Sequence, residues 1–211
     1  MRKILALALT VVLFALPQVL AVGTSIQLLG VAWNHNPSVY IALQKGVDPR
    51  FKSIMVLALD AWINSLNTKV GGQVFSYTLL TSVTKTQPAD ITITLKKNWG
   101  NVLGSTSISS SGATITSVKV ALATYNAMGL PLDGGDVFTI AAHELGHAWG
   151  LGHATDDGVP PQDLMSPYFD FTASNNVFVQ PSGLDIKAVL AIYGNNGFLL
   201  PNPNPGGTVY P

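Results

Sequence analysis

The sequence predicts a single α+β domain, because segments with a two-residue hydrophobic period lie on both sides of a first helix and further helices follow them. Of its 211 residues, 47% are hydrophobic and only 10% are charged, which excludes a disordered chain. The 11 basic and 11 acidic residues balance, so no nucleic-acid partner is expected. Because cysteine is absent, disulfides, thiolate metal sites and catalytic thiols are excluded.

The first 21 residues have the pattern of a secretory signal peptide. An uncharged apolar run over residues 4–16 follows Arg2 and Lys3, and Pro17 and a step ending at Ala21 come after it. The run is shorter than the roughly 20 residues that cross a bilayer as a helix. We therefore expect a secreted, extracellular monomer that has no membrane partner after cleavage, with a membrane anchor through residues 4–21 as the alternative.

The next elements are a strand and a long helix. Apolar residues rich in β-formers predict a strand over 33–43. Asp48 is the expected cap of the following helix and Pro49 its first residue. One apolar stripe at intervals of three or four residues predicts four to five turns, and it comprises Phe51, Met55, Ala58, Trp62 and Leu66.

Alternating apolar residues predict half-buried strands over 75–79, 91–95 and 118–122. A run rich in Ser and Thr over 102–108 predicts a short exposed strand, whose edge could accept another chain.

Two helices and a tail complete the chain. A second helix is expected after Asp136 as its N-cap, reaching about Trp149. A third begins after Ser182, with Asp185 completing a capping box, and stops at Gly194. The domain is thus expected over 22–194, and the Pro- and Gly-rich residues 195–211 are expected to be an extended, loosely packed tail.

The second helix carries the candidate chemistry. Three of the four histidines, and the only glutamate of the chain, fall within residues 143–153, in the pattern His-Glu-x-x-His-x-x-Gly-x-x-His. His143 and His147 are four residues apart, so both rings lie on one helix face and can hold one metal ion. His153 would point away if the helix continued, so the chain must turn, and Gly150 stands where that break is required.

Three neutral imidazoles leave a zinc ion an open fourth position, which is typical of a catalytic site, although a structural zinc site remains the alternative. Glu144 directly follows a ligand and lies about 100° around the helix from it. Its carboxylate can therefore flank a zinc-activated water as general base without ligating the ion. A surface glutamate is the other interpretation of Glu144.

This motif resembles the signature of the metzincin zinc endopeptidases, which is followed by a methionine-containing turn. Residues 163–168 resemble that turn, with Met165 as the apolar floor beneath the metal. Among metzincins the matrixins, which are the matrix metalloproteinases and their microbial relatives, are most similar, because residues 89–93 resemble their third strand and residues 186–194 their closing helix. Pro167 also falls two residues after the methionine, as in matrixins.

The resemblance covers about residues 33–194 and implies a metzincin-like domain with a twisted mixed five-stranded sheet, three helices and a zinc cleft. It implies that strand 102–108 binds a polypeptide substrate as an added strand. The implied pocket residues are Gly104, Ser105 and Thr106 on this strand and Pro167, Tyr168 and Phe169 on the opposite wall. The chain departs from the family at Ala154, where matrixins usually carry serine, and in having no propeptide cysteine.

Calcium is possible but not claimed, because Asp133 and Asp136 could equally form a turn and a helix cap. His35 is assigned no role. The expected function is a secreted zinc endopeptidase with His143, His147 and His153 as ligands and Glu144 as base. The alternative is a secreted zinc-binding adhesion or capture module whose cleft is occluded or inactive.

Overall fold

The computed structural model describes residues 25–97, 102–155, 163–167 and 177–211. The expected signal peptide, Tyr168 and Phe169 lie outside these residues. Among the described helices, none combines the length and the apolar character that crossing a membrane requires.

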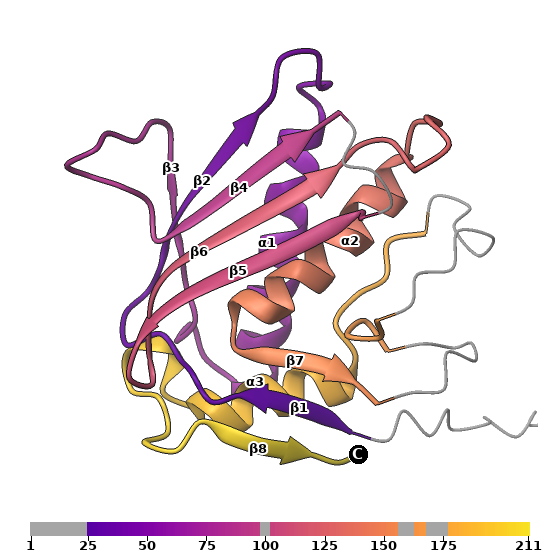
Figure 1. Cartoon of the computed structure of the whole chain (residues 1–211). Coiled ribbons are helices and arrows are strands. Elements are labelled where there is room, and N and C mark those ends of the chain that lie inside the picture. Colours follow the sequence, from indigo (N-terminus) through magenta and orange to yellow (C-terminus); the bar gives the residue numbers. More distant parts are fainter. Residues whose placement is uncertain (1–24, 98–101, 156–162, 168–176) are drawn as a thin grey trace, which may run out of the picture.

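A mixed five-stranded sheet forms the upper layer of the molecule (Figure 1). Its order is β3-β2-β4-β6-β5, and only β5 runs antiparallel to its neighbour. Apolar residues of β4 and β6 alternate into the core, as their two-residue period predicts. The strands are β2 (Ser38–Leu43), β3 (Thr78–Leu80), β4 (Ile91–Lys96), β5 (Gly104–Ser111) and β6 (Thr114–Ala123).

Two predicted strands are shorter than expected. The strand predicted over 33–43 begins only at Ser38, while Trp33 is fully buried and its indole N–H donates a hydrogen bond to the backbone of helix α2 (Gly134–Ala148). The strand predicted over 75–79 is reduced to β3, because Phe75 packs edge-on against Tyr193 and Phe198 instead of joining the sheet. Burial of large aromatic side chains therefore overrides local strand preference at both positions.

The long helix α1 (Phe51–Val70) lies behind the sheet beside α2 (Figure 1). Its predicted stripe is confirmed, since Met55, Ala58, Trp62 and Leu66 are buried. The prediction of Asp48 as its cap is wrong, because the residue before the helix is Arg50. Asp48 instead closes the preceding turn, where its carboxylate accepts the Arg50 N–H at 2.9 Å.

The other two helices begin with capping boxes. Helix α2 (Gly134–Ala148) begins earlier than predicted, because Asp133 is its N-cap and Asp136 is the third residue of its first turn. The carboxylate of each aspartate accepts the backbone N–H of the other, at 2.8 and 3.2 Å. Helix α3 (Gly183–Tyr193) begins at the predicted box of Ser182 and Asp185.

A second sheet, which the sequence did not predict, crosses the lower part of the molecule (Figure 1). It consists of β7 (Leu151–Ala154), β1 (Ile26–Leu29) and β8 (Gly206–Val209), in that order and antiparallel throughout. The expectation of a loosely packed tail is therefore wrong. Phe198, on the short helix η1 (Gly197–Leu199), is also fully buried and contacts Trp149 and Tyr193.

Removing residues 206–211 is expected to lower the free energy of unfolding by about 1–3 kcal/mol. The truncation exposes one edge of β1, which pairs with β8 over four residues, and each backbone hydrogen bond contributes about 0.5–1.5 kcal/mol net. Urea denaturation of the two chain lengths measures the difference. Equal midpoints would mean that β8 adds nothing to the fold.

Candidate metal centre

The helix that carries the motif is fixed by two tryptophans. The indole N–H of Trp62, on α1, donates to the carbonyl of Ala142 at 2.8 Å, directly before the first motif histidine. The indole N–H of Trp33 donates to the carbonyl of Ala148 at 2.9 Å, at the end of α2. Both rings are fully buried, so α2 is held at two points of its length.

His143 and His147 face one another on α2, as their spacing predicts. Their Nε2 atoms lie 3.1 Å apart, close to the about 3.3 Å that a tetrahedral ion with ligands about 2.0 Å away would require. The Nδ1 atoms bond to the carbonyl oxygens of Leu164 and Leu151, at 2.7 and 2.8 Å. Because a carbonyl only accepts, each Nδ1 carries the proton and each Nε2 keeps its lone pair for a metal.

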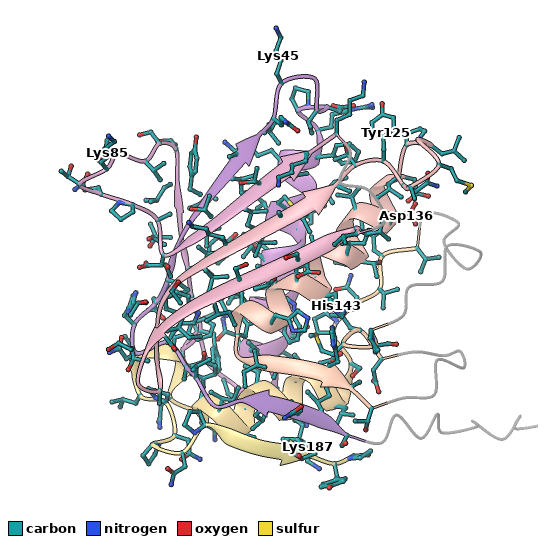
Figure 2. All side chains as sticks on the ribbon, in the orientation of Figure 1. Lys45, Lys85, Tyr125, Asp136, His143 and Lys187 are labelled. Carbon is teal, nitrogen blue, oxygen red and sulfur yellow. The ribbon has the colours of Figure 1, made fainter. Side chains whose placement is uncertain are left out.

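The third histidine, His153, is brought to the other two by the predicted turn after α2. Helix α2 ends at Ala148, Gly150 has φ +98°, and β7 then returns His153 to the other two rings. The ring of His153 lies 4.7 Å from that of His147 and 5.3 Å from that of His143, between centroids. Each histidine offers a ring nitrogen within 4.8 Å of the others, so the three fit one zinc ion. In Figure 2, His143 lies on α2 between the ribbons of β5 and β7.

Met165 connects the two elements that carry the histidines. It is fully buried, and its sulfur atom packs so closely on Gly146 of α2 that a side chain there would displace it. Its carbonyl accepts the N–H of Ala154, the residue after His153, at 2.8 Å. The methionine therefore lies against the motif helix and holds β7, as a floor under the site would.

Glu144 is only 6% exposed and lies against β5. The hydroxyl of Thr106 lies 2.6 Å from its Oε2 and 3.0 Å from its backbone oxygen. A Cβ atom at Gly104 would collide with the Glu144 carboxylate. Burial raises the pKa of Glu144 to about 7, although the Thr106 hydrogen bond works in the opposite direction. The interpretation as a surface glutamate is therefore wrong.

The implied substrate residues are placed only in part. Gly104, Ser105 and Thr106 are half-buried on β5, which among the described strands pairs only with β6 and so leaves one edge open. Pro167 is exposed two residues after Met165, and its neighbours Tyr168 and Phe169 lie outside the described residues. His35 lies 3.3 Å from Asp90, in a contact that the site does not use.

Buried histidines and buried carboxyl groups respond to acid in opposite ways. Burial lowers the pKa of His143 to about 3 and that of His147 to about 4, and it raises the pKa of Asp185 to about 6. Below about pH 6.5 these histidines bind protons in the unfolded chain but stay neutral in the folded chain. Their contribution to the free energy of unfolding therefore decreases as pH falls. Between about pH 7 and 4, folded Glu144 and Asp185 keep protons that the unfolded chain releases, which stabilises the fold as pH falls.

In the metal-free protein, the two carboxyl groups should therefore partly offset the loss of stability caused by His143, His147 and His153 between about pH 6.5 and 4.5, and the free energy of unfolding should decrease more steeply below about pH 4. Bound zinc should be released at a higher pH than that decrease, because protons compete for the ligands. Urea denaturation and zinc content, followed over one pH series, measure the two events. Simultaneous loss of zinc and fold near pH 6 would contradict this expectation.

Three histidines from a helix and the strand after it, above a buried methionine, are the arrangement that the resemblance to metzincins implies. The family model of the matrixins, a peptidase family, matches residues 57–194. The chain belongs to the matrixin family. This membership agrees with its three helices, its mixed five-stranded sheet and its histidine cluster.

Several characterised proteins are similar to part of the chain. Matrix metalloproteinase-16 of Homo sapiens is 38% identical over 77 residues, which are 36% of this chain and 12% of that protein. Interstitial collagenase of Oryctolagus cuniculus is 40% identical over 76 residues, covering 36% and 13%. Matrix metalloproteinase-20 of Homo sapiens is 37% identical over 71 residues, covering 34% and 14%. The similarity thus spans about an eighth of the length of these relatives.

Proposed function

We propose that the protein is a secreted zinc endopeptidase that hydrolyses peptide bonds in exposed polypeptide segments. The observation that carries the proposal is the convergence of a ring nitrogen from each of three histidines next to a buried glutamate that is not one of them. Secretion is supported by the signal-peptide pattern of residues 1–21.

Zinc held by His143, His147 and His153 would polarise the peptide carbonyl and acidify a water molecule. Glu144 takes the proton of the attacking water and delivers it to the departing amine. Burial of the Glu144 side chain favours this exchange, because a carboxylate shielded from bulk water holds a proton more readily than an exposed one. The open edge of β5 aligns an extended substrate beside Glu144 by strand addition.

The first test combines metal analysis with a cleavage assay. The purified chain should contain one zinc ion, and it should cleave an unfolded protein such as casein until a zinc chelator is added. Stoichiometric zinc without cleavage of any unfolded substrate would favour the adhesion or capture module instead. Absence of zinc binding would contradict both functions.

A further inference from the structure

The contact between Thr106 and Glu144 joins the edge strand β5 to the motif helix α2. The two residues are 38 positions apart, and the hydroxyl lies 2.6 Å from Oε2. This is the short distance typical of a hydroxyl that donates to a charged carboxylate. Among the described residues, Oε1 has no such hydrogen bond, so Thr106 distinguishes the two oxygens of Glu144.

The backbone around this contact leaves the glutamate little freedom. Gly104 lies two residues earlier on the same face of β5, and a side chain there would collide with the Glu144 carboxyl group. The same Thr106 hydroxyl also lies 3.0 Å from the Glu144 carbonyl oxygen, so it contacts both the backbone and the side chain of that residue. The Glu144 carboxyl group therefore lies between Gly104, which has no side chain, and the Thr106 hydroxyl, which donates a hydrogen bond to it.

We propose that Thr106 is a positioning residue for the general base, which holds Oε2 of Glu144 and leaves Oε1 to exchange the proton with the attacking water. This inference rests on the proposed function and refines the assignment of Thr106 from substrate contact to support of Glu144. The hydroxyl acts through Glu144 and touches neither the substrate nor the metal. A residue with this role affects the rate of the bound complex more than the binding of substrate.

The composition of the chain allows the hydrogen bond between Thr106 and Glu144 to be measured directly. Glu144 is the only glutamate, so selective carbon-13 labelling of glutamate gives one side-chain carboxyl signal in an NMR spectrum. Thr106→Val removes the donor with little change in volume, Thr106→Ser keeps the donor, and Thr106→Ala serves if the valine variant does not fold. Thr116→Val is the matched control, because Thr116 donates to the carbonyl of Ser109 at 3.1 Å on the exposed side of the β5–β6 pair.

In the metal-free protein, T106V should raise the pKa read from the carboxyl signal, because the lost hydrogen bond favours the charged form. T106S and T116V should leave it near the wild-type value. In the zinc-loaded protein, T106V should lower kcat by about 10- to 100-fold with KM and zinc content unchanged, and T106S should restore the rate.

An unchanged carboxyl pKa in T106V would overturn the inference, whether or not the protein cleaves peptides. If T106V changes KM but not kcat, Thr106 contacts the substrate and does not position Glu144. If T106V and T106S lower kcat equally, Thr106 acts only through packing. If the wild-type protein binds zinc but cleaves nothing, the proposed function fails, and the carboxyl titration still decides whether Thr106 holds Glu144.

Discussion

Replacing Glu144 with glutamine is expected to lower kcat/KM for peptide cleavage by about 10²- to 10⁴-fold, the usual contribution of a general base. Glutamine keeps the shape of the side chain and an oxygen for the Thr106 hydroxyl, but it cannot take a proton from water. The histidines are untouched, so zinc content and melting temperature should stay at the wild-type values.

Asp60→Asn is the matched control for this variant. It changes a carboxylate to an amide on α1, where the oxygen accepts a hydrogen bond from the Tyr77 hydroxyl at 2.9 Å, and Asp60 is not part of the histidine cluster. Cleavage of an internally quenched peptide, followed over a pH series, measures both variants. Full activity in E144Q would show that proton transfer does not pass through Glu144, and zinc loss in E144Q would leave the residue as a structural support.

Replacing Gly150 with alanine should be the most damaging single methyl addition at the metal centre. Its φ of +98° strains any other residue, at about 1–3 kcal/mol. The added Cβ would also lie 2.6 Å from the Val31 carbonyl oxygen and 3.0 Å from the Ile192 side chain, which costs about 1–3 kcal/mol more. The sum is a large part of a typical stability of about 5–15 kcal/mol.

Gly46→Ala separates the two causes, because Gly46 has a similar φ of +87° but nothing within 4 Å of the added atom. Urea denaturation should show a clearly larger loss in G150A than in G46A. The zinc affinity of G150A should also fall, because the turn places His153 and the Leu151 carbonyl that orients His147. Equal losses in the two variants would mean that the contact with Val31 relaxes without cost.

Much of the fold could be predicted because its signals are local. The stripe of α1, the capping box of α3 and the alternation of β4 and β6 each depend on neighbouring residues. The start of α2 was missed although Asp133 and Asp136 have the spacing of a capping box, because the two glycines between them disfavour a helix. The sheet of β1, β7 and β8 was missed because each strand has four residues and is defined by distant pairing.

The candidate site divides in the same way. The spacing of His143 and His147 and the break at Gly150 are local, and the structure places all three histidines together. His143 and His147 are oriented by the backbone carbonyls of Leu164 and Leu151. Every residue has a backbone carbonyl, so the sequence does not indicate which ones contact the rings. Thr106 was found on the correct strand, but its contact with Glu144 depends on how β5 packs on α2.

The small sheet of β1, β7 and β8 links metal affinity to the order in which the chain assembles. Ser25 and Thr155 are 130 residues apart and are joined by a hydroxyl contact of 2.8 Å and a backbone hydrogen bond of 2.9 Å, just beyond His153. Two ligands form locally on α2, but the third is fixed only when this distant pairing closes, and closing such a long loop costs entropy.

A metal ion that binds all three histidines favours the closed sheet by mass action, so part of its binding energy is used in closing it. During synthesis, β1 is made first and β8 last, so one edge of β1 has no partner until residues 206–209 exist. Metal uptake should therefore follow the pairing of β1 with β7, and β8 should strengthen it by completing the sheet. Changes at Ser25 or in β8, which touch no ligand, should then weaken metal binding through the cost of assembling the sheet.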